Sequence, residues 1–190
     1  ESGIRAWAAE PGEYYHAFNG SYGGLWRRNG RPPQMLAGVG FSAQGKFEGS
    51  YYRRTEESRN PELGWMFQGL EDEEILGDFG FSGGGAAGFE LDRADIRLGS
   101  PENIQIIGRS ENHSSSFVLV PEEMLTHITN WPGEEEQQKL IRADLVYFKT
   151  PSGGEVFSTG SITFCGSLPW NDFDNNISRL LENVMKRFLR

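Results

Sequence analysis

Glu90 is the residue whose neighbours most suggest chemistry. It lies between Phe89 and Leu91, directly after the glycine-rich run SGGGAAG at 82–88. Glycine lets the backbone turn sharply or approach a ligand closely, so this run beside a carboxylate can form a pocket wall. A carboxylate held among apolar groups can become a usable general acid or base. The simpler interpretation is a strand residue that faces solvent or pairs with Arg93.

His113 is a weaker candidate, placed in the polar stretch SENHSSS at 110–116. A histidine there can act as an acid–base group or a ligand, although a loop histidine is more often simply solvated. His16 and His127 have weaker contexts. No two histidines have the spacing of metal ligands, so the sequence predicts no histidine metal site.

Cys165, the one cysteine, follows a predicted strand and precedes Gly166, as a hydrolase nucleophile would. Thr163 stands where the nucleophile motif has glycine, so we expect a buried thiol that packs as a small hydrophobe. A single cysteine provides neither a disulfide framework nor a cysteine-rich metal site. It suits a reducing compartment, and we expect a cytoplasmic location.

Length and charge restrict the class of protein. The chain has 190 residues and a net charge of -9, which fits one acidic domain and disfavours nucleic acid as a partner. No apolar run approaches the ~20 residues that span a bilayer, so no membrane association is expected. The acidic runs at 71–74 and 133–139 lack the alternating ligands of a calcium loop and indicate solvated surface.

The elements that must position these residues are mostly strands. Residues 1–35 form an irregular, aromatic-rich segment, 36–170 are predicted to be mostly β, and 174–190 a helix. The expected strands are 35–45, 65–70, 73–81, 88–95, 103–110 and 116–120. In the strand at 88–95, Phe89 and Leu91 would share one face and Glu90 the other.

Turns, a hairpin and helices complete the prediction. Residues 51–65 indicate a polar loop with a turn at Asn60–Pro61. The segments 143–150 and 155–164 flank a PSGG turn and predict a β-hairpin. Helical segments are expected from Pro121 and over 134–142. The last helix has an apolar residue every three or four positions and a cap at Asp174 or Asn175.

Several long motifs together resemble one family. These are RAWAAEPGEYYHAFNGSYGGLWRRNGRPPQ, GVGFSAQG, YYRR, GDFGFSGGGAAGFELDRAD and GSLPWNDFDNNISRLLENVMKRF. In this order they resemble the C-terminal part of the N,N-dimethylformamidase large (beta) subunit family, over essentially the whole chain. The resemblance implies an α/β fold: the C-terminal portion of a class I glutamine-amidotransferase-like domain, with β-rich insertions and a C-terminal helix. Residues 1–190 would be one C-terminal fragment of a larger subunit.

The resemblance also implies an activity and a cofactor. Members would hydrolyse the C–N bond of N,N-dimethylformamide or a related small formamide to formate and an amine. The family's mononuclear iron is held by two tyrosines and a glutamate in motifs expected upstream of Glu1. Tyr14, Tyr15 and Tyr22 do not sit in the matching motif, so no metal ligand is assigned here. The implied partners are the small amide, the upstream part of the subunit and a small subunit in a hetero-oligomer.

Glu90 gains a role from the resemblance, because GGGAAGFELDRAD resembles the motif of a proton-transfer glutamate near the iron. The isolated segment is then expected to be inactive. His113 matches no family role. Two other interpretations stay open. One is a non-catalytic binding or scaffold module whose aromatic residues stack a carbohydrate or form a subunit interface. The other is a thiol hydrolase that uses Cys165.

Overall fold

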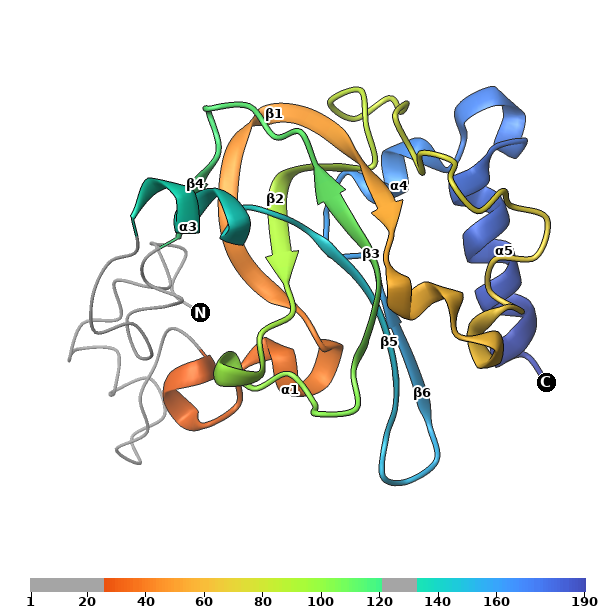
Figure 1. The fold of residues 1–190 in the computed structure, drawn as a ribbon, viewed down its shortest axis with the longest axis horizontal. Helices are drawn as coiled ribbons and strands as arrows, with labels where there is room; N and C mark the ends of the chain where they lie inside the picture. The colour runs from red at the N-terminus through yellow and green to blue at the C-terminus, as the bar shows by residue number, and fades with distance from the viewer. Residues whose placement is uncertain (1–25, 121–132) are drawn as a thin grey trace, which may run out of the picture.

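The computed structural model describes residues 26–120 and 133–190 (Figure 1). Its strands are β1 (Gly40–Arg54), β2 (Ala87–Arg93), β3 (Gln105–Glu111), β4 (Val118–Leu119), β5 (Asp144–Lys149) and β6 (Glu155–Ser158). Its α-helices are α1 (Pro33–Ala37), α3 (Glu134–Leu140), α4 (Phe164–Ser167) and α5 (Asn176–Phe188). Short 3₁₀ turns are η3 (Trp26–Asn29), η4 (Glu56–Arg59), η5 (Pro61–Leu63), η6 (Ile96–Leu98) and η7 (Trp170–Phe173).

The long strand β1 organises a six-stranded sheet in the order β2-β1-β3-β5-β6, with β4 also paired to β1. The first part of β1 pairs with β2 and β4, and Tyr51–Arg54 pairs with β3, all antiparallel. On the far edge of β2, the Asp92 amide donates to the Gly160 carbonyl at 2.7 Å. The chain after β6 therefore meets β2, and the sheet curls back on itself (Figure 1).

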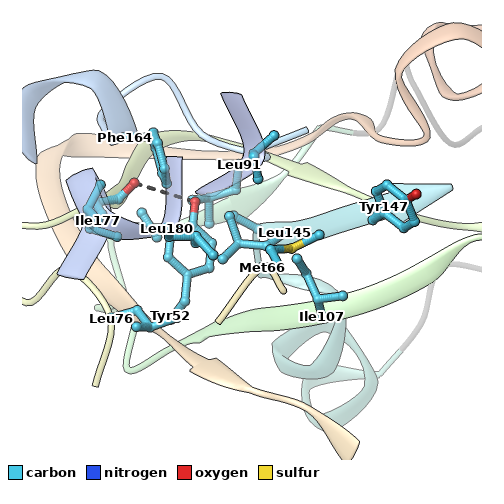
Figure 2. Close-up of a cluster of buried hydrophobic side chains, with 14 of the residues drawn as sticks. Tyr52, Met66, Leu76, Leu91, Ile107, Leu145, Tyr147, Phe164, Ile177 and Leu180 are labelled. Atoms are coloured by element: carbon cyan, nitrogen blue, oxygen red, sulfur yellow. Dashed lines mark hydrogen bonds between the residues drawn. The ribbon is translucent and has the colours of Figure 1, made fainter. Parts of the chain in front are cut away.

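The core fills the inside of this curl. Tyr52, Leu91, Ile107 and Leu145 point into it from four strands and are completely or almost completely buried. Figure 2 shows these side chains in one buried cluster that also contains Ile177 and Leu180 of α5. The Tyr52 hydroxyl donates to the Thr159 carbonyl at 2.6 Å, which satisfies its polar end within the apolar interior.

Within residues 65–81, two strands were predicted, at 65–70 and 73–81, and this was wrong. The segment turns repeatedly and makes one isolated bridge, Tyr52 to Leu76. Gly69, Gly77 and Gly80 have φ between 74° and 152°, a backbone region that breaks strand geometry. Met66 and Leu76 are nevertheless buried, because the turns place them against α5 and not in a sheet face.

Helix α5 holds this irregular segment by hydrogen bonds from its buried face. Asn183 donates to the carbonyls of Met66 and Gln68, both at 2.9 Å. The predicted helix and its cap are confirmed, because the Asn175 side chain accepts the Ser178 amide at 2.8 Å. A polar residue on the apolar face of α5 thus supplies the partners that an irregular backbone needs.

Other predicted element boundaries differ from those in the structure. The predicted short strand at 35–45 begins at Gly40 and continues to Arg54, so the expected loop at 51–65 starts only after Arg54. The tyrosines at 51–52 are strand residues because aromatic side chains fit a half-buried sheet. The rest of that loop is made of η4 and η5, and Asn60 caps η5 by accepting the Glu62 amide.

The strands predicted at 88–95, 103–110 and 116–120 are confirmed as β2, β3 and β4, and the hairpin as β5 and β6. Helix α3 confirms the helix expected over 134–142. Strand β6 ends earlier than predicted, at Ser158. Gly160 has φ 68° and Phe164 begins α4, so the chain turns where the sequence suggested a continued strand.

Some predictions fall outside the described residues: the segment 1–25, with His16 and three tyrosines, and the helix expected from Pro121, with His127. The glutamine-amidotransferase-like fold class is not tested by this arrangement and stays a prediction. Among the described helices, none is both long enough and apolar enough to cross a membrane.

Candidate functional site

Glu90 lies at an interruption in the pairing of β1 and β2. Gln44 pairs with Glu90, and the next pair along is Gly49 with Gly88. Residues 45–48 of β1 therefore lie opposite the single residue Phe89, and we call these four residues the β1 excursion. Irregularities of this kind bend a strand and redirect the neighbouring side chain, and they are common next to active sites.

Phe89, directly before Glu90, has an unusual backbone. Its φ is 59°, in the left-handed region that bulky residues rarely adopt, at a cost of about 1–3 kcal/mol. Its ring packs edge-on against Phe47 of the β1 excursion, with 5.6 Å between centroids. Phe47 is 63% exposed, so an open aromatic surface adjoins Phe89, the residue directly before the glutamate.

The glycine run has a clear structural use at this place. A Cβ on Gly88 would lie 2.1 Å from the Glu48 carbonyl oxygen, and one on Gly85 2.3 Å from the Ser50 carbonyl oxygen. The Gly83 carbonyl accepts a hydrogen bond from the Gly49 amide at 2.6 Å. The absence of side chains thus lets the run pack backbone to backbone against the end of the β1 excursion.

Glu90 itself is partly exposed and, within residues 26–120 and 133–190, its carboxylate has no hydrogen bond or ion pair. The suggested pairing with Arg93 is wrong, because that guanidinium is buried and binds Asp95 at 2.9 Å and the Leu140 carbonyl at 3.2 Å. Glu90 does not line any of four surface pockets formed by residues in the described ranges. Its carboxylate is therefore available to a group that approaches this face.

His113 is not the solvated loop residue that the sequence suggested. Its Nε2 lies 2.6 Å from the Ser110 hydroxyl, and its ring packs on Phe117 at 4.7 Å. Burial lowers the pKa of His113 to about 4, although the charge of Glu48 opposes that shift. His113 lines a pocket of about 340 Å³ with Ser110, Lys139 and Arg142. A mostly neutral imidazole with a low pKa is a weak base at neutral pH.

Cys165 is exposed in α4, so the expectation of a buried thiol was wrong. The chain leaves β6 at Ser158 and turns into α4, and this turn places Phe164 in the core and Cys165 outside it. Within the described residues its sulfur has no hydrogen bond to a histidine or other base.

Glu48 is a residue of this site that sequence reasoning missed. Its carboxylate accepts hydrogen bonds from the hydroxyls of Ser114 and Ser116, and these bonds lower its pKa. The partners are 66 and 68 residues away along the chain, so no local pattern could have revealed them. Through Glu48, the loop that carries His113 is connected to the strand that faces Glu90.

A metal centre was tested against the side chains present. Among residues 26–120 and 133–190, no three histidine, cysteine, aspartate or glutamate side chains lie close enough together to hold an ion. The histidine, cysteine and carboxylate side chains of the described ranges therefore form no metal cluster of their own.

Comparison with known proteins gives the family. The family model described as "N,N-dimethylformamidase beta subunit-like, C-terminal" matches residues 1–176. Proteins named N,N-dimethylformamidase beta subunit from Alcaligenes sp and Paracoccus aminophilus are each 39% identical over all 190 residues. The chain spans about a quarter of the length of these relatives, 25% of each. From this match, the chain belongs to the N,N-dimethylformamidase beta subunit-like, C-terminal family.

Proposed function

We propose that this chain supplies Glu90 as the proton-transfer carboxylate of an enzyme that hydrolyses the C–N bond of N,N-dimethylformamide or a related small formamide. The relatives at 39% identity are named for dimethylformamide, and the chain matches them along its whole length. This supports the reaction class. The role of Glu90 rests on the resemblance of GGGAAGFELDRAD to the motif of a proton-transfer glutamate, and the surroundings of Glu90 support it.

The position of Glu90 in the sheet carries this proposal. A carboxylate without a hydrogen bond or ion pair among the described residues lies beside a left-handed Phe89 and an irregular strand pair. Strained backbone concentrates at functional sites, and here it directly precedes the unpaired acid, whereas an unpaired surface acid without such a neighbour, such as Glu102, marks no site. The exposed ring of Phe47 adds an apolar surface that suits a substrate with two methyl groups.

The proposed chemistry needs one group that both accepts and donates a proton. A water molecule adds its oxygen to the formyl carbon while the Glu90 carboxylate takes one of its protons. The tetrahedral intermediate then collapses, the C–N bond breaks, and Glu90 returns the proton to the amine nitrogen. The products are formic acid and dimethylamine, which exchange a proton in water to become formate and dimethylammonium, and the glutamate regains its charged form.

The iron implied by the family resemblance is assigned to chain outside this one. Among the described residues, no group of histidine, cysteine and carboxylate side chains could hold the ion, and Glu90 has its proposed role without being a ligand. We propose that the remaining three quarters of the large subunit, together with a small subunit in a hetero-oligomer, complete the site over Glu90 and the Phe47 ring. The relatives named as beta subunits support an assembly of this kind.

The test is a Glu90→Gln variant of the complete, iron-loaded assembly that contains this chain. We expect kcat for N,N-dimethylformamide to fall by about 10²–10⁴-fold, the typical contribution of a positioned acid–base group. Glu102→Gln is the matched control, since Glu102 is exposed and its side chain has no partner among the described residues. Iron content and assembly size should be the same in both variants.

Full turnover by Glu90→Gln would refute the proposed role and favour a non-catalytic module. A Cys165→Ser variant separates the thiol alternative, because it should keep full activity if Glu90 carries the proton. The exposure of Cys165 makes this substitution harmless to the core.

A further inference from the structure

The β1 excursion is held by a loop from a distant part of the sequence. The Glu48 carboxylate accepts from Ser114 and Ser116, and the Lys46 amide donates to the Ser116 hydroxyl at 3.3 Å. These serines belong to residues 112–117, which we call the serine loop. Three of its hydrogen bonds therefore end on two residues of the excursion.

A ring from the same loop supports the start of the excursion. Phe117 is 4% exposed and fills the space beside Gly45, where a Cβ would lie 2.6 Å from the ring. The serine loop thus fixes both ends of the four-residue excursion, one by packing and the other by charge-assisted hydrogen bonds.

The opposite side of the excursion is fixed by backbone contact. Gly88 lies directly against the Glu48 carbonyl, and Gly83 accepts the Gly49 amide. Phe89 follows Gly88 and must cross from this close contact to the pair of Glu90 with Gln44. Its left-handed backbone spans that step, so Phe89 turns between the contact of Gly88 with Glu48 and the pair of Glu90 with Gln44.

From these contacts we propose that Glu48, clamped by Ser114 and Ser116, is a positioning residue that acts through Phe89 to orient the Glu90 carboxylate. This inference rests on the proposed function of Glu90. Glu48 points to the serine loop, and the proposed role involves no contact between Glu48 and the substrate.

The first test compares Glu48→Ala with Glu48→Gln in the complete assembly, with N,N-dimethylformamide as substrate. We expect Glu48→Ala to lower kcat by about 10–100-fold, since a misplacement of ~1 Å can cost 10²-fold, while KM changes less than about twofold. Glu48→Gln should restore most of kcat, because its amide oxygen still accepts a serine hydroxyl. A kcat of Glu48→Ala equal to that of the wild type would overturn the proposal.

The second test removes the donors in place of the acceptor. The double variant Ser114→Ala/Ser116→Ala should lower kcat to the level of Glu48→Ala, with KM again nearly constant. Glu102→Ala removes an exposed glutamate outside the clamp and should keep wild-type kcat. If the serine variant kept full kcat, the clamp would have no part in catalysis.

The third test asks whether Glu48 acts through Glu90. When one residue works only by positioning another, the second loss removes the effect of the first. Glu48→Ala/Glu90→Gln should therefore turn over as slowly as Glu90→Gln alone, and no slower. An additional 10-fold loss in the double variant would show an independent role for Glu48 and contradict the inference.

These results separate the two proposals. Wild-type kcat in Glu90→Gln would refute the proposed function, and with it the clamp. A collapse in Glu90→Gln with wild-type kcat in Glu48→Ala would refute the clamp alone. Loss of folding in Glu48→Ala, seen as a lower melting temperature, is separated by Glu48→Gln, which must then regain kcat for the inference to stand.

Discussion

Asp144 and Glu90 look alike in the sequence but occupy opposite environments. Each acid lies between apolar residues, Asp144 in ADLV and Glu90 in FELD. Asp144 is fully buried, accepts the Ala94 amide and the Arg142 guanidinium at 3.0 Å each, and lies 3.5 Å from Arg109. Glu90 is partly exposed and has no such partner in the described ranges. Asp144 has the hydrogen bonds and ion pairs of a structural acid. Glu90 lacks them and follows an irregular backbone, which makes it a candidate catalytic acid.

The largest expected effect comes from removing the structural acid. Asp144→Ala should lower the free energy of unfolding by about 3–5 kcal/mol, because it leaves Arg142 and the buried Ala94 amide without their partner. Burial raises the pKa of Asp144 even though Arg142 favours its charged form, so the ion pair itself is not strongly stabilising. The expected loss of stability comes from the buried groups that would be left without Asp144. Urea denaturation measures the change. Glu102→Ala, at an exposed site, should shift stability by less than about 0.5 kcal/mol.

The next effect tests how tightly the Glu90 region is built. Gly88→Ala would place a methyl group 2.1 Å from the Glu48 carbonyl, so β1 and β2 must separate. We expect a loss of about 1–3 kcal/mol in the free energy of unfolding, the usual cost of overpacking. Gly64→Ala is the matched control. Its φ of -54° suits alanine and its nearest contact, the Pro61 carbonyl oxygen, is 3.3 Å away, so stability should change by less than about 0.5 kcal/mol. Equal stability of both variants would show that the two strands are loosely packed at Gly88.

The sequence predicted the elements with strong local patterns and missed those that depend on distant partners. The α5 periodicity, the Asn175 cap and the β5–β6 hairpin are local signals, and each is confirmed. The segment 65–81 failed because its apolar residues are buried through turns that Asn183 holds from more than 100 residues away. Glu90 was singled out from its glycine run, and its role stays a prediction. Glu48 was missed because its serine partners lie in another part of the chain.

A smaller, pH-dependent effect on stability is expected from His113 in the serine loop. Burial lowers the pKa of His113 from 6.5 to about 4, so the unfolded chain binds a proton in this range that the folded chain does not. This contribution to stability is complete above pH 6.5 and is lost as the pH falls toward 4. Partial exposure reduces the effect to about 1–2 kcal/mol. Urea denaturation of wild type and His113→Gln at pH 7, 5 and 4 should show a smaller decline in the variant. Parallel curves would mean that His113 titrates as it does in the unfolded chain.

The Glu90→Gln variant should change the stability of the chain least. Glu90→Gln removes a charge that no described group pairs with, so the free energy of unfolding should change by less than about 0.5 kcal/mol. The same substitution is expected to reduce turnover by orders of magnitude, and this contrast is typical of a functional acid placed where it does not serve the fold. Urea denaturation of the Glu90→Gln and Asp144→Ala chains under one buffer condition makes the comparison direct. A loss above about 1 kcal/mol in Glu90→Gln would mean that this carboxylate, like Asp144, stabilises the sheet.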